Sequence, residues 1–116
     1  WLAGGVGGGG GRAPAGARPP HLAAFLGTRL GMAEGFLAGH ASAARAEEEA
    51  RGACEAFAGA GACRRAALVL NRCVALALSG DGTLHTGFGG DRAMAEAEAR
   101  GDCGPAGGCE LVASGC

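Results

Sequence analysis

Two stretches of the chain place alanine and cysteine on one face of a predicted helix and charged residues on the others. The first runs from about residue 43 to 57, and Ser42 before it is a suitable N-cap. In the second, Asp91 takes the place of the cap. These faces are formed by Ala46, Ala50, Ala53, Cys54 and Phe57, and by Ala95, Ala99, Asp102 and Cys103. Because small side chains let a helix approach a sheet closely, we expect both helices to lie against β-structure.

Short apolar runs around these helices predict strands. Arg65 to Leu70 and Cys73 to Leu78 are rich in Val, Leu and Ala, and the two residues between them leave room only for a tight turn or a bulge. The sequence Ser79-Gly80-Asp81-Gly82 then favours a hairpin turn. Further strands are expected at residues 1–6, 83–88 and 109–113.

Residues 7–34 have a different character. Glycine and proline are frequent in residues 7–20, which predicts an extended linker or a surface loop. After Pro20, apolar residues recur at helical intervals, so we expect an inserted helix over residues 21–34. Its apolar side chains are candidate contacts, either with the sheet of this domain or with a partner protein: Leu22, Phe25, Leu26 and Leu30.

A nine-residue block occurs twice in the chain. Residues 46–54 recur as residues 95–103, and seven of the nine positions are identical. Each copy ends in a cysteine and is followed by two more, so all six cysteines belong to one duplicated pattern. The first half contains Cys54, Cys63 and Cys73, and the second contains Cys103, Cys109 and Cys116.

The duplicated halves are residues 35–73 and 74–116. Each unit has the predicted order strand, strand, helix, strand, with residues 1–6 corresponding to residues 73–78. We therefore expect a single α+β domain over residues 1–116. Its two repeats would form a mainly antiparallel sheet with the helices on one face. The insertion at residues 7–34 has no counterpart, which makes it the first place to look for a specific function.

The composition leaves little material for a hydrophobic core. Alanine and glycine make up almost half of the 116 residues, and Leu, Val, Phe, Met and Trp together number only twenty-two. Burying one such side chain contributes roughly 1.5–3 kcal/mol, whereas ordering the backbone costs roughly 1–2 kcal/mol per residue. The fold therefore needs covalent links or a partner. Six cysteines can supply three disulfides, which persist in oxidising compartments.

Charge and hydropathy exclude two classes of partner. The net charge is −1, and the ten basic residues are all arginine and scattered, so no nucleic-acid surface is expected. There is no run of eighteen apolar residues, so we predict no membrane span. The chain begins at Trp1 without a visible signal peptide, and we expect a processed or trimmed product.

The helix and cysteine pattern resembles family 4189 of the domains of unknown function. The shared features are Ala- and Glu-rich helices ending in cysteine, a following strand that opens with cysteine, and the segment Cys73-Val74-Ala75-Leu76-Ala77. They lie at residues 46–54, Cys63, residues 73–77, residues 95–103 and Cys109, within residues 35–116. The resemblance implies a small exported protein with a disulfide-linked α+β domain. It implies no catalytic residues.

Six cysteines allow fifteen pairings, and the sequence alone does not choose among them. Repeat symmetry favours Cys54–Cys63 and Cys103–Cys109, each tying a helix end to the next strand. Cys73 and Cys116 are then left to link the two halves.

Other chemistry lacks the patterns that it requires. There is no C-x₂₋₄-C knuckle, and His21, His40 and His85 are far apart in sequence, so we expect no metal site. The chain contains no C-x-x-C redox motif. The G-x-G-x-x-G match at residues 5–10 lies in a glycine run with no βαβ context, so no cofactor is expected. The acidic run at residues 47–49 indicates a solvated helix face.

These observations favour a non-enzymatic, disulfide-stabilised binding domain. We expect an accessory subunit attached to a larger protein assembly in an oxidising compartment: secreted, periplasmic or within an organelle lumen. The alternative is a free secreted effector, an enzyme inhibitor or an immunity-type protein. A small hydrolase or redox enzyme is a third hypothesis, for which the sequence offers no catalytic set and no identified small-molecule substrate.

Overall fold

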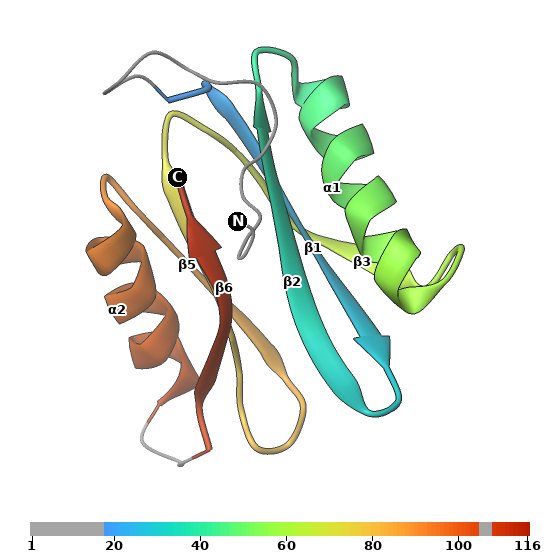
Figure 1. The fold of residues 1–116 in the computed structure, drawn as a ribbon. Coiled ribbons are helices and arrows are strands. Elements are labelled where there is room, and N and C mark those ends of the chain that lie inside the picture. Colours follow the sequence, from blue (N-terminus) through green and yellow to red (C-terminus); the bar gives the residue numbers. More distant parts are fainter. Residues whose placement is uncertain (1–17, 105–107) are drawn as a thin grey trace.

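The computed structural model describes residues 18–104 and 108–116, which form six strands and two helices in the order ββαβ–ββαβ (Figure 1). Ser42 and Asp91 cap the two helices as expected, accepting hydrogen bonds from the backbone N–H groups of Arg45 and Met94. The elements are β1 (His21–Arg29), β2 (Met32–His40), α1 (Ala43–Ala58), β3 (Cys63–Leu70), β4 (Cys73–Leu78), β5 (Leu84–Gly89), α2 (Arg92–Cys103) and β6 (Glu110–Gly115).

The strands form two three-stranded antiparallel sheets rather than the single sheet expected. One sheet has the order β2-β1-β3 and the other β5-β4-β6. In each sheet the strand that comes first in the sequence is central, and the other two strands flank it. The α+β class is confirmed, and its antiparallel pairing is as predicted.

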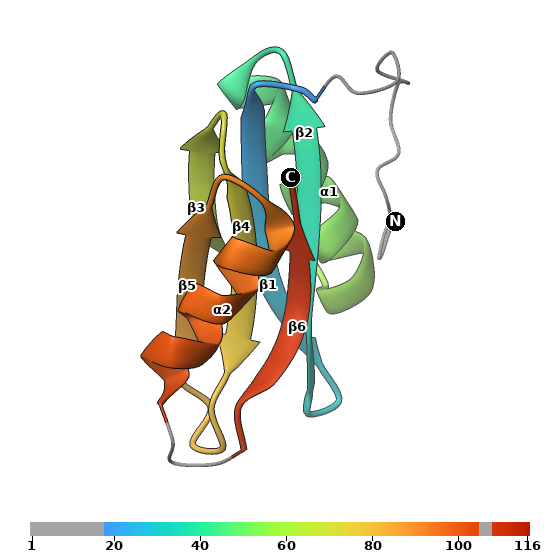
Figure 2. The ribbon, with the colours of Figure 1, turned by 90° about the vertical axis from the view of Figure 1, so that its left-hand side faces the viewer.

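The molecule has four layers, with the two sheets stacked between the two helices (Figures 1 and 2). Side chains from both sheets fill the space between them, including Leu22, Val74 and Leu76. Helix α1 covers the outer face of the first sheet, and α2 covers the outer face of the second. The expectation that both helices share one face is therefore wrong. Each sheet is covered by a different helix, because both α1 and α2 have a face of small side chains that can pack closely on a sheet.

The alternation along the central strands explains this layering. In β4, Val74 and Leu76 point to the other sheet, whereas Ala75 and Ala77 point to α2. Successive side chains of a strand face opposite sides, so large residues meet between the sheets and small ones meet the helices. Gly87 of β5 extends the small surface, because a Cβ there would lie 2.2 Å from the carbonyl oxygen of Ala95. The helix thus packs directly on the strand backbone.

Both central strands change register at one point. In β1 the shift lies between Ala24 and Phe25, where Ala66 of β3 is skipped. In β4 it lies between Leu76 and Ala77, where Val112 of β6 is skipped. Each shift comes between the fourth and fifth residues of the central strand. The two sheets therefore share order, helix placement and the position of a bulge, a feature that adds local twist to a strand pair.

The helix expected over residues 21–34 is wrong, because this segment is β1 and the start of β2. β1 is central and buried on both faces, so it carries a nearly continuous apolar run from residue 22 to 26. Such a run satisfies helical intervals as well as strand alternation. The turn Leu30-Gly31 decides the outcome, since both residues have positive φ (53° and 79°), the backbone of a two-residue hairpin loop.

β1 has the central place in the first sheet that β4 has in the second. The strand predicted at residues 1–6 and most of the linker predicted at residues 7–20 lie outside the described residues. Pro19 and Pro20 directly precede β1.

Candidate functional site

Three disulfides connect the six cysteines, in the same pairs that repeat symmetry predicts. Cys54–Cys63 joins the last turn of α1 to the first residue of β3. Cys103–Cys109 joins the end of α2 to the residue before β6. Both bonds hold a helix end against the sheet that the helix covers.

The third disulfide, Cys73–Cys116, closes one end of the second sheet. Cys73 opens β4, and Cys116 follows β6, which pairs with β4 in an antiparallel register. The bond therefore lies within the second sheet. It joins Cys73, the last residue of the first predicted half, to the second predicted half as expected, but it does not connect the two sheets. Residues 71–72, between β3 and β4, connect the first sheet to the second.

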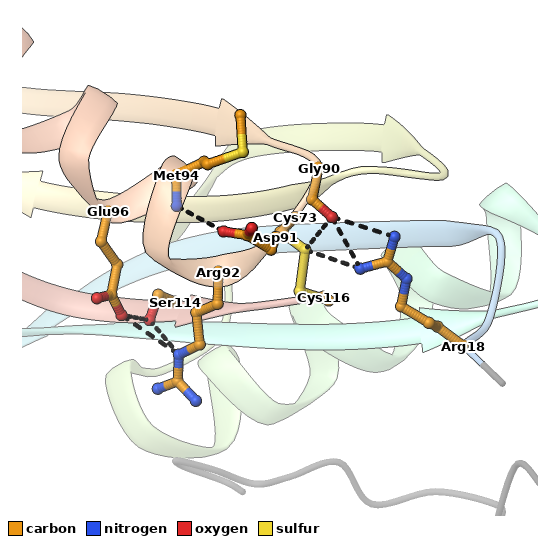
Figure 3. The surroundings of a disulfide bond; sticks show 9 residues. All are labelled: Arg18, Cys73, Gly90, Asp91, Arg92, Met94, Glu96, Ser114 and Cys116. Carbon is orange, nitrogen blue, oxygen red and sulfur yellow. Dashed lines mark hydrogen bonds and ion pairs between the residues drawn. A yellow bond between two sulfur atoms is a disulfide. The ribbon is translucent and has the colours of Figure 1, made fainter. Parts of the chain in front are cut away.

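An arginine from outside both halves lies beside this disulfide (Figure 3). The Nη1 atom of Arg18 donates a hydrogen bond to Cys73 Sγ at 3.0 Å. Both terminal nitrogens of Arg18 also lie 3.4 Å from the carbonyl oxygen of Gly90. Cys73 is fully buried, whereas Cys116 is half-buried. The guanidinium therefore contacts the sulfur of the fully buried cysteine, and Cys116 is the more exposed residue of the pair.

Polar contacts at the start of α2 hold β6, the strand that Cys116 follows (Figure 3). Arg92 Nε donates to Ser114 Oγ at 2.8 Å and lies 3.3 Å from Glu96 Oε2. The Ser114 hydroxyl donates in turn to Glu96. These bonds join the first turns of α2 to β6 independently of the disulfide.

A second polar cluster surrounds His85 of β5. Its Nδ1 lies 2.9 Å from Asp102 Oδ2, and its Nε2 lies 3.3 Å from Ser79 Oγ. The imidazole is 18% exposed. Serine, histidine and aspartate thus have the pairwise contacts of a nucleophile, a base and an orienting carboxylate.

The hydroxyl proton of Ser79 is nevertheless used elsewhere. Ser79 donates to Asp81, and its Oγ also lies 3.3 Å from the carbonyl oxygen of Thr83. The hydrogen bond from Ser79, followed by that from the backbone N–H of Thr83, lowers the pKa of Asp81 to about 2. A serine whose single proton goes to a carboxylate does not offer it to His85. The cluster is therefore best described as a polar link between the β4–β5 turn and the end of α2.

The four apolar candidates for partner contact have different positions. Leu22, Phe25 and Leu26 are buried in this chain, so three of the four contact its own core. Leu30 lies at the tip of the β1–β2 hairpin and is 90% exposed, and Met32 beside it is 65% exposed. Of the predicted contact residues, Leu30 is the one that remains available to a partner.

Sequence reasoning missed Arg18 and the His85 cluster. Arg18 belongs to a Pro- and Gly-containing stretch that gives no signal for a contact 55 residues away. Asp102 did carry a signal, because it is one of two positions where the nine-residue blocks differ, with Ala53 in the other copy.

Within residues 18–104 and 108–116, no three His, Cys, Asp or Glu side chains are grouped so that they could hold a metal ion. No helix in the same residues has the length and apolar character needed to cross a membrane. Each cysteine of the chain is in a disulfide.

The chain belongs to the family Domain of unknown function (DUF4189), whose model matches residues 29–116. The match extends from the end of β1 to Cys116 and so includes both helices and all six cysteines. Neither a curated protein nor a solved structure matches this chain.

Proposed function

We propose that this chain is a non-enzymatic, disulfide-stabilised protein-binding domain that acts as an accessory subunit of a larger assembly. The tip of the β1–β2 hairpin is the binding element. The observation that supports this is the exposure of Leu30 and Met32, two large apolar side chains on one turn. In a chain with few large apolar residues, those left in water have a cost that a partner surface would remove.

The backbone of Leu30 supports the same proposal. Its φ of 53° belongs to the left-handed region, where a leucine costs roughly 1–2 kcal/mol relative to ordinary backbone. Asparagine and glycine are the residues that favour such a turn. A leucine held there at 90% exposure is unfavourable for the free domain and is consistent with selection for a contact.

The proposed setting is an oxidising compartment: secreted, periplasmic or within an organelle lumen. Three disulfides support it, because such bonds persist where thiols are not kept reduced. We further propose that the two halves are copies of one ββαβ unit. The matching sheet order and bulge position support this.

The test is native purification of the full chain from its own source, followed by native mass spectrometry with and without reductant. We expect a retained partner protein with the wild-type chain and its loss in the double variant Leu30→Asn/Met32→Thr. The matched control is Met94→Thr, which removes a 58% exposed methionine from α2 instead of the hairpin. This control should retain the partner.

A compact monomer with no retained partner would contradict the proposal, as would equal retention by the hairpin variant. Co-purification with a toxin or a hydrolase would favour the alternative, an enzyme inhibitor or an immunity-type protein. Turnover by the isolated chain in a hydrolase screen would contradict both.

A further inference from the structure

We propose that Cys73–Cys116 is a site of thiol–disulfide exchange, at which an external thiolate attacks Cys116 and the Cys73 thiolate leaves beside Arg18. This goes beyond the binding function and does not depend on it. The other reactant is a small thiol or an exposed thiol of a redox protein. The residues that carry the proposal are Cys73, Cys116 and Arg18 (Figure 3).

The direction of attack follows from burial. Cys73 is fully buried, so its sulfur is shielded from an incoming thiolate, whereas Cys116 is half-buried at the end of β6. Attack at Cys116 forms a bond between the external sulfur and Cys116 Sγ and breaks the bond to Cys73 Sγ. The electron pair of the broken bond goes to Cys73, which leaves as a thiolate, and the external thiolate is the only co-reactant.

Arg18 is placed to stabilise that leaving group. Its Nη1 already lies 3.0 Å from Cys73 Sγ and points a proton at it. Exchange is faster when the leaving thiolate is stabilised, and a neighbouring guanidinium favours the ionised sulfur. The carbonyl oxygen of Gly90, 3.4 Å from both terminal nitrogens of Arg18, helps to hold the guanidinium there.

The other two disulfides provide an internal comparison. Each also joins a buried cysteine, Cys54 or Cys103, to a half-buried one, so residue exposure does not distinguish the three bonds. The hydrogen bonds found in residues 18–104 and 108–116 give neither of the other two bonds a guanidinium partner. Arg18 is therefore the feature that marks Cys73–Cys116.

The equivalent strand pairing in the first sheet forms without a disulfide at this position. In the first sheet the register places His21 opposite Leu70, at the positions that Cys73 and Cys116 hold in the second. The same strand order forms there without a disulfide. The end of β6 is also held by Arg92 and Ser114, so opening the bond leaves the strand attached.

The test exposes the full chain to reduced glutathione under native conditions. Free thiols are then blocked at intervals, and fragmentation mass spectrometry locates glutathione and the blocking group. We expect glutathione on Cys116 and the blocking group on Cys73, with this bond opening about tenfold faster than the other two. In Arg18→Gln the same opening should slow about tenfold.

Arg72→Gln is the matched control, since Arg72 precedes Cys73 but lies over the ring of Phe88, 5.6 Å from its centroid. It should open within about twofold of the wild-type rate. Glutathione on Cys73, earlier opening of another disulfide, no mixed disulfide at all, or equal rates in Arg18→Gln and wild type would each overturn the proposal. The site of glutathione attachment is read in the wild-type chain, so that result does not depend on the variants folding.

Discussion

His21 and Cys73 hold the same place in the two sheets. Each is the first residue of a central strand, and in both strands the register shift follows the fourth residue. Their cross-strand neighbours also correspond, because His21 is opposite Leu70, and Cys73 is bonded to Cys116. That the halves arose by duplication stays a prediction, but the equivalence of these positions can be tested directly.

The double variant His21→Cys/Leu70→Cys should form a fourth disulfide on oxidation. The loop that it closes is slightly longer than that of the Cys73–Cys116 bond, whose sequence separation is 43. The loop-entropy estimate gives a stabilisation of at most about 4 kcal/mol. Thiol counting and chemical denaturation under oxidising conditions measure the two effects. Two persistent free thiols in the folded chain would show that the two sites differ in geometry.

Gly87 should not tolerate a side chain. A Cβ there would lie 2.2 Å from the carbonyl oxygen of Ala95 and 2.3 Å from the backbone nitrogen of Ala99. Gly87→Ala must move α2 away from β5, so we expect a loss of about 1–3 kcal/mol in the free energy of unfolding. Urea denaturation measures it.

Gly101→Ala is the matched control for Gly87. Gly101 lies in α2 with no atom within 4 Å of its added Cβ. Alanine is a better helix former, so this variant should gain about 0.5–1 kcal/mol. If both substitutions change stability equally, the close approach of α2 to Gly87 is not what the fold depends on.

The two helices could be predicted from sequence because their signals are local. Ser42 and Asp91 are capping residues at the right spacing from a small face, and such signals do not depend on the rest of the fold. The strands after α1 were predicted for a similar reason, since Asn71 and Arg72 allow only a tight turn. The cysteine pairs followed from the repeat, which relates each helix end to the strand after it.

The segment at residues 21–34 could not be assigned by periodicity. A strand buried on both faces loses its alternation, and Leu22 to Leu26 then satisfies both patterns. The division into two sheets was missed for a different reason. The sequence of one strand carries no information on which other strand packs across it. Arg18 was missed because its contact with Cys73 depends on tertiary structure and not on spacing.

Leu30→Asn should stabilise the isolated domain. Asparagine tolerates the left-handed backbone that Leu30 adopts at the first position of the hairpin loop. The leucine has almost no packing to lose, since it is 90% exposed. We expect a gain of about 1 kcal/mol in the free energy of unfolding, measured by denaturation. An equal loss would mean that Leu30 packs in the free domain, which would also weaken the proposed binding role of the tip.

The hydrogen bonds of Asp81 should make stability depend on pH in the acid range. The bond from Ser79, and then that from the Thr83 backbone, lowers its pKa from 3.8 to about 2. The folded state therefore favours the carboxylate, and its contribution is fully present above the ordinary pKa of 3.8. As the pH falls from 3.8 towards 2, the unfolded chain binds a proton before the folded one, and the contribution is lost.

Asp81→Asn removes this titration but keeps an oxygen that accepts the same hydrogen bonds. As the pH falls from 3.8 to about 2, the wild-type chain should lose more of its free energy of unfolding than Asp81→Asn does. Ser79→Ala should give an intermediate slope, because it removes the largest cause of the shift and leaves the bond from Thr83. Urea denaturation at a series of pH values measures all three. Parallel curves for wild type and Asp81→Asn would show that the turn does not hold the carboxylate, since every other acid of the chain is common to both.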